Sequence, residues 1–134
     1  TILLKVNLET GKSTRVTLSN VNKIDFKGLV KDNKGNFYAY RRDYTNTDNY
    51  IKQLVKIDIS TGHQSVITNL DIEGSYFTDL AFDEQENSIF GFTRGQLGNT
   101  ILLKVDLETR KSTKIVLSNI ITTDFASLIF IPKQ

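Results

Sequence analysis

The sequence predicts an all-β chain built from a repeated unit of about 49 residues, and the evidence is internal similarity. Residues 1–20, TILLKVNLETGKSTRVTLSN, return almost unchanged as TILLKVDLETRKSTKIVLSN at residues 100–119. A weaker copy, LVKIDISTG, stands between them at residues 54–62. The lysines shared by the three copies are Lys5, Lys56 and Lys104. Their spacings are 51 and 48 residues, and periods of this size are typical of solenoids, propellers and arrays.

A second motif repeats at the same interval and begins each unit. The segments FKGLVKD at residues 26–32, FTDLAFD at residues 77–83 and FASLIFI at residues 125–131 share a Phe followed three residues later by a Leu. In the first two copies a polar turn, DNKGN or DEQEN, leads into an aromatic run. This pattern predicts a β-hairpin, and DNKG is the stronger of the two turn sequences.

The long repeat predicts a second hairpin that completes each unit. Apolar residues alternate with more polar residues from Ile101 to Leu107, which is the period of a strand with one apolar face. A short polar turn and the β-branched segment STKIVLSN follow at residues 112–119. Gly11 and Gly62 supply a positive φ at this turn in two copies. Arg110 stands there in the third, so we expect the turn to tolerate either residue.

Four short antiparallel strands in about 49 residues are typical of the blade of a β-propeller. The segment KIDISTG at residues 56–62 resembles the Asp-x-x-Thr-Gly stretch of quinoprotein-type blades. The segment LAFDEQENSIFGF at residues 80–92 is similar to a stretch of the bacterial propellers of the NHL and YVTN types. This resemblance implies propeller blades along nearly all of the chain.

The strand order predicts blades that are incomplete at both ends of the chain. We expect a half blade at residues 1–20, complete blades at residues 24–70 and 76–119, and the first strand of a further blade at residues 124–134. A closed ring uses typically 4–8 blades, so the chain is a fragment of a longer propeller or one subunit of a ring. Open strand edges invite pairing, either with further blades of a longer chain or with another copy. We therefore expect no stable monomer. An array of small β-sandwich domains is the competing fold.

Composition excludes several classes of function. Seventeen basic residues against 15 acidic ones give a net charge of +2 without charged blocks, which predicts no nucleic-acid partner. The apolar runs are too short for membrane insertion. The absence of Cys excludes thiol catalysis, disulfides and thiolate metal sites. Because the chain starts at Thr1 and contains no Met, we expect it to be processed or part of something longer. His63, the only histidine, stands in a turn, where we expect a solvated side chain.

The segment RRDYTNTDNY at residues 41–50 is the first candidate ligand site. The residues predicted to contact a ligand are Arg41, Arg42, Asp43, Tyr44 and Tyr50. Flanking tyrosines suit a sugar ring, and the oxygen-rich side chains of Asp43, Asn46 and Asp48 form a weak calcium candidate. The alternative is a long polar connection that helps to cap the sheet. Elsewhere, the acidic pair Glu84 and Glu86 is interpreted as a solvated turn rather than as the facing carboxylates of a glycosidase.

The second candidate site lies on the first strand of each unit. A polar residue stands between the shared Phe and Leu in each copy, and we expect these residues, Lys27, Asp79 and Ser127, to align with one another. The first strand of a propeller blade lines the central channel, where ligands bind. The alternative is that these residues form the polar lining of a water-filled channel.

We predict a non-catalytic binding or scaffolding module that is secreted or displayed at the cell surface, with a glycan or protein ligand and no cofactor. One alternative is a fragment of a propeller enzyme, such as a lyase or quinoprotein-like dehydrogenase, whose active site is in other blades. Another is a structural repeat of an extracellular fibre, which the near-identity of residues 1–20 and 100–119 favours.

Overall fold

The structure is a computed structural model that describes residues 3–46, 50–72, 77–95 and 98–121. These residues form ten antiparallel strands and no helix, so the prediction of an all-β chain is confirmed. The strands form one two-stranded sheet and two four-stranded sheets in which neighbours in sequence are neighbours in space. Within this described part, no helix is long and apolar enough to cross a membrane.

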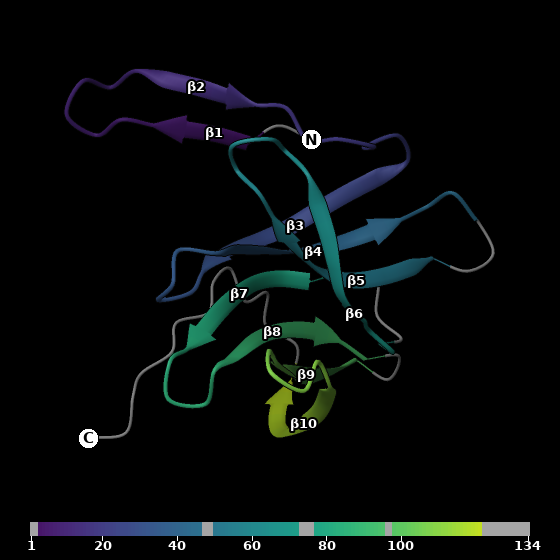
Figure 1. The fold of residues 1–134 in the computed structure, drawn as a ribbon. Coiled ribbons are helices and arrows are strands. Elements are labelled where there is room, and N and C mark those ends of the chain that lie inside the picture. Colours follow the sequence, from purple (N-terminus) through teal and green to yellow (C-terminus); the bar gives the residue numbers. More distant parts are fainter. Residues whose placement is uncertain (1–2, 47–49, 73–76, 96–97, 122–134) are drawn as a thin grey trace.

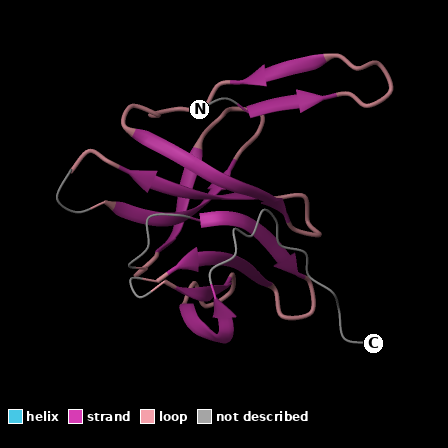
Figure 2. Ribbon diagram, turned by 180° about the vertical axis from the view of Figure 1, so that it is seen from behind, coloured by secondary structure: helices cyan, strands magenta, loops and turns pink. Residues whose placement is uncertain are grey.

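Each sheet corresponds to one repeat unit or part of one. The N-terminal hairpin consists of β1 (Leu3–Val6) and β2 (Ser13–Val16). The middle blade consists of β3 (Ile24–Lys31), β4 (Phe37–Asp43), β5 (Ile51–Ile57) and β6 (Gln64–Asn69). The C-terminal blade consists of β7 (Phe77–Asp83), β8 (Ser88–Arg94), β9 (Asn99–Asp106) and β10 (Ser112–Ile121). The middle blade lies between the hairpin and the C-terminal blade in both views (Figures 1 and 2).

The strand registers show which parts of the three sheets are equivalent. Each shared lysine faces a residue of the next strand at the same point of the ladder, and the pairs are Lys5–Thr14, Lys56–Ser65 and Lys104–Thr113. Strands β1, β5 and β9 are therefore the third strands of their units, and β2, β6 and β10 are the fourth strands. The hairpin is the outer half of a propeller-type blade, and the predicted segment 124–134 lies outside the described residues.

The recurring Asn or Asp of the long repeat caps the turn between the third and fourth strands. Asn7 Oδ1 accepts hydrogen bonds from the backbone N–H groups of Glu9 and Thr10, both at 2.9 Å. Asp58 and Asp106 accept equivalent bonds at 2.7–2.9 Å from residues two or three positions later. These side chains mimic a backbone turn, so the most visible sequence repeat has a local structural cause.

The residue that closes this turn adopts the left-handed conformation in every copy. Its φ is +66° at Gly11, +73° at Gly62 and +60° at Arg110. A non-glycine residue in this region is uncommon and costs about 1 kcal/mol. The expectation that the turn accepts either residue is confirmed by Arg110.

Two apolar cores lie between consecutive sheets, and strand alternation assigns side chains to them. Tyr38, Tyr40 and Leu54 of the middle blade share one core with Ile89 and Leu103 of the C-terminal blade. On the opposite face of the middle blade, the side chains in the second core are Ala39, Val55 and Ile57, and the hairpin side contributes Leu3 and Leu18. Successive side chains of a strand point to opposite faces, so one blade contributes to both cores.

The first strands of the two blades, β3 and β7, lie against each other. A β-carbon on Gly28 would lie 2.9 Å from Leu80 Cγ, so glycine allows this close approach, and Gly28 also has a φ of +60°. Both strands are irregular here, between Lys27 and Leu29 and between Phe77 and Leu80. The two inner strands therefore carry the same kind of irregularity at matching points, and a bulge of this kind bends a strand and increases its twist.

Candidate functional site

A polar-aromatic cluster lies at the end of the middle blade where β4 leaves the sheet. We define it by Asp25 of β3, Arg42 of β4, and Tyr44 and Tyr50 of the connection from β4 to β5. The β3–β4 register places Asp25 directly opposite Arg42, so the two side chains emerge from the same face of the sheet. The backbone of Tyr44 is fixed by a hydrogen bond of 2.8 Å from its N–H to the carbonyl of Lys23.

Asp25 is the centre of this cluster. Arg42 donates two hydrogen bonds to its carboxylate, from Nη2 at 2.8 Å and from Nε at 3.3 Å, and Tyr44 donates a third at 2.6 Å. Burial alone raises the pKa of Asp25, but the bonds from Arg42 and Tyr44 outweigh this effect, so the pKa lies below its usual value. The two bonds from Arg42 to one carboxylate fix the orientation of its planar guanidinium group.

The aromatic rings extend from this fixed centre toward solvent. The guanidinium carbon of Arg42 lies 4.5 Å from the centre of the Tyr44 ring, within the range of a cation–π contact. The Tyr44 and Tyr50 rings meet edge to face with their centres 5.0 Å apart. Tyr50 is 40% exposed, so the cluster ends in a ring that is oriented by its neighbour and accessible to a ligand.

Positive charge surrounds the cluster. Lys27 follows Asp25 on the same face of β3, and its charge contributes to the lowered pKa of Asp25. Lys52 of β5 is the cross-strand neighbour of Arg42 and donates a hydrogen bond to the carbonyl of Ile72. Arg42 and Lys27 therefore act on the Asp25 carboxylate, and Lys52 adds a third cation one strand further away.

Strand alternation divides the first candidate site predicted from the sequence. Arg42, Tyr44 and Tyr50 come together, whereas Arg41 and Asp43 lie on the opposite face and form their own ion pair at 3.5 Å. Hydrogen bonds from Thr45 and the charge of Arg41 hold the pKa of Asp43 below its usual value. Arg41 and Asp43 are thus engaged with each other rather than with the cluster.

The structure places the remaining predicted residues unevenly. Lys27 lies beside the cluster, and Asp79 lies on the adjacent inner strand, where its Oδ1 accepts a bond from the Leu80 N–H. Asp79 is not the structural counterpart of Lys27: Leu29 and Leu80 occupy matching positions, so Asp79 matches Gly28. Asn46 is exposed, while Asp48 and Ser127 lie outside the described residues. Across the described ranges, no group of three or more His, Cys, Asp or Glu could hold a metal ion.

Asp25 was missed by the sequence analysis. Its role depends on facing Arg42 across two strands, and this register becomes visible only in the structure. The one sequence feature that distinguishes it is an Asp inside the segment IDFKG, at a position where a half-buried strand favours apolar or β-branched residues.

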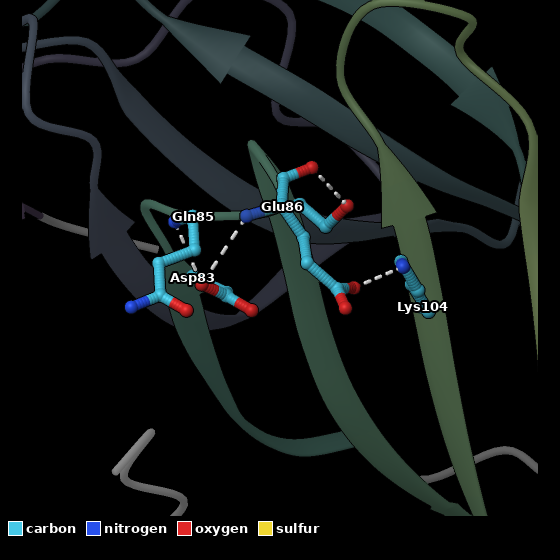
Figure 3. A network of polar contacts seen from close by, with 5 residues as sticks. Asp83, Gln85, Glu86 and Lys104 are labelled. Carbon is cyan, nitrogen blue, oxygen red and sulfur yellow. Dashed lines mark hydrogen bonds and ion pairs between the residues drawn. The ribbon is translucent and has the colours of Figure 1, made fainter. Parts of the chain in front are cut away.

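The turns between the first and second strands are explained by their own hydrogen bonds. The carboxylate of the buried Asp83 accepts bonds from the N–H groups of Gln85 at 2.9 Å and Glu86 at 3.4 Å, and Glu86 pairs with Lys104 (Figure 3). Asp32 has the same role in the middle blade. Turn capping therefore accounts for Asp83 and Asp32, and the ion pair with Lys104 accounts for Glu86. His63 is exposed in its turn as expected.

The fold and the cluster together define an all-β protein of propeller-type blades that carries an oriented, positively charged aromatic surface. No family model matches the chain, and no curated protein matches it. Among solved structures the chain is similar to one described as the crystal structure of a nidogen/laminin complex, with 10% sequence identity and a TM-score of 0.46. The match covers 81% of this chain and 53% of that chain, so this chain spans about half the length of the structure it matches.

Proposed function

We propose that the chain is a non-catalytic binding module of a β-propeller, secreted or at the cell surface, that holds an acidic glycan at the polar-aromatic cluster. The observation that carries this proposal is the exposed ring of Tyr50, which Tyr44 orients beside the fixed guanidinium of Arg42. The finer assignment to NHL, YVTN or quinoprotein-like blades stays a prediction from the two sequence motifs. The enzyme fragment and the fibre repeat likewise stay predictions from the sequence.

The chemistry of the cluster suits a ring with a negative substituent. An aromatic side chain with one polar end provides an apolar face for a pyranose ring and stays in contact with water. Lys27 is exposed beside the cluster. Its cationic side chain can donate to a carboxylate or sulfate group a charge-assisted hydrogen bond, which is stronger than a bond between neutral groups. Arg42 is already paired with Asp25, so we assign it the role of orienting Tyr44, while Lys27 supplies the positive potential.

Isothermal titration calorimetry with tetragalacturonate, and with its neutral methyl ester as the matched sugar, tests the proposal. We expect saturable binding of the acidic sugar that weakens as salt is added, because screening reduces interactions between exposed charges. Tyr50→Ala should weaken binding by about tenfold, equivalent to about 1.4 kcal/mol. Val116→Ala, a change at an exposed apolar residue of β10, is the control and should bind normally. Equal binding of the two sugars, or unchanged binding by Tyr50→Ala, would contradict the proposal.

A further inference from the structure

An apolar groove of about 280 Å³ lies between the N-terminal hairpin and the middle blade. Its apolar lining includes Leu3 and Leu18 from the hairpin side and Phe26, Leu29, Ala39 and Ile57 from the middle blade. The equivalent space between the middle and C-terminal blades is only about 10 Å³. The same kind of interface is therefore filled in one place and open in the other.

The exposure of equivalent residues shows what fills the closed interface. Leu29 of β3 is 44% exposed, whereas its counterpart Leu80 of β7 is 6% exposed. Leu80 belongs to the core that contains Tyr38 and Tyr40, which are residues of the second strand of the preceding blade. Among the described residues, the hairpin contains a third and a fourth strand and pairs with no equivalent of β3 and β4 that would lie over Leu29.

The backbone of the hairpin is open at the same place. Among the described residues, β1 pairs only with β2. Its equivalents pair on both sides, β5 with β4 and β6, and β9 with β8 and β10. The inner edge of β1, Leu3–Val6, is therefore open, whereas the equivalent edge of β5 or β9 is paired with the second strand of its blade.

We propose that the inner edge of β1 and the adjoining groove form a β-augmentation site for a β-hairpin of the β3–β4 type. The second strand of the incoming hairpin pairs with β1 through the backbone, and its aromatic side chains enter the groove over Leu29. This occupant is the one that the closed interface shows, because Tyr38 and Tyr40 of β4 cover Leu80 in that way. Strand addition of this kind takes affinity from main-chain hydrogen bonds and specificity from alternate side chains. The inference is independent of the glycan proposal.

The probe is a synthetic peptide of residues 24–43, which spans β3, its turn and β4. Titrated into the isotope-labelled full chain, it should bind saturably and slow amide exchange along Leu3–Val6. Leu29→Lys in the full chain should weaken binding at least about tenfold, because a charge enters the apolar groove. Val66→Lys, at a residue of β6 that is also 44% exposed, is the matched control and should bind as the unchanged chain does. A peptide with Tyr38→Ala and Tyr40→Ala should bind more weakly.

The outcomes separate the proposal from its alternatives. Protection of the β1 amides that is lost with Leu29→Lys and kept with Val66→Lys supports it. Absence of binding, binding that is equal in both variants, or binding without protection of β1 overturns it. Self-association of the chain that the peptide does not reverse also overturns it, since a second copy would then associate through a different surface. Circular dichroism of each variant shows whether the blades are intact, and the peptide variant tests the same contact without changing the chain.

Discussion

Gly62→Ala should detach the N-terminal hairpin from the middle blade, whereas Gly11→Ala should not. The two glycines close equivalent turns and have similar φ values, +73° and +66°. A β-carbon on Gly62 would lie 1.8 Å from the carbonyl oxygen of Thr17, while a β-carbon on Gly11 has nothing within 4 Å. Both substitutions carry the conformational penalty of about 1 kcal/mol for a left-handed residue, so their difference isolates the contact with Thr17.

The magnitude follows from the interactions that hold this contact. The Gly62 carbonyl accepts from the Ser19 N–H at 3.1 Å and from Ser19 Oγ at 3.2 Å, and Gln64 Nε2 donates to the Ser19 carbonyl at 2.6 Å. Each bond contributes about 1 kcal/mol net. Leu18 is 4% exposed, and burial of such a side chain contributes roughly 1.5–3 kcal/mol. Detachment therefore removes at most about 6 kcal/mol, reduced by the entropy that the released residues regain.

Amide hydrogen exchange measures this effect directly. In Gly62→Ala we expect fast exchange at Ser19, while β8 and β9 of the C-terminal blade keep their protection, because the opening is local. Gly11→Ala is the matched control and should leave the protection of Ser19 unchanged. If the two variants exchange alike at Ser19, the hairpin is not held through Gly62 and the reasoning is wrong.

Three further predictions test the turn, the cluster and the core. Hydrogen bonds from Ser60 lower the pKa of Asp58 to about 2. The ionised Asp58 should therefore stabilise the fold fully at a pH above the pKa of this residue in the unfolded chain, and the stabilisation should disappear as pH falls through about 2. Asp58→Asn should remove this pH dependence of the free energy of unfolding, as measured by denaturant unfolding at each pH. Asp25→Ala should lower the free energy of unfolding by about 1–3 kcal/mol in denaturant titrations, because Arg42 loses its partner. Leu107→Ala should destabilise by about 1–2 kcal/mol and Leu8→Ala by less than about 0.5 kcal/mol, because Leu107 packs on the core and Leu8 is 94% exposed.

The strands and turns could be predicted from the sequence because their causes are local. Alternation identifies a strand with one apolar face, and a residue that favours turns ends it. The Asp of KIDISTG caps its turn through neighbours two residues away, so no knowledge of the rest of the fold is needed. That this turn position accepts an arginine was visible for the same reason, since alignment of the three copies places Arg110 at the position of Gly11 and Gly62.

The candidate site was predicted less completely because its causes are not local. The partnership of Asp25 with Arg42 depends on the register of β3 against β4, and a bulge after Lys27 shifts that register further along the strand. Two other errors could have been avoided from the sequence. The match of Lys27 with Asp79 was wrong because Lys27 follows its Phe by one residue and Asp79 follows its Phe by two, so Asp79 matches Gly28, as the registers confirm. The separation of Arg41 from Arg42 follows from the two-residue period of a strand.

Residues 1–20 and 100–119 separate what a segment encodes by itself from what its neighbours add. The two segments are almost identical, and each contains an antiparallel pair of strands joined by the same capped turn. Yet Leu103 and Val105 are each 2% exposed, while their counterparts Leu4 and Val6 are 61% and 50% exposed. The local conformation is thus set within the segment, whereas burial depends on a preceding blade, which β9 has and β1 lacks among the described residues. The apolar residues that alternate along β1 therefore mark an interface, because the equivalent residues of β9 form the face on which one blade packs against the blade before it.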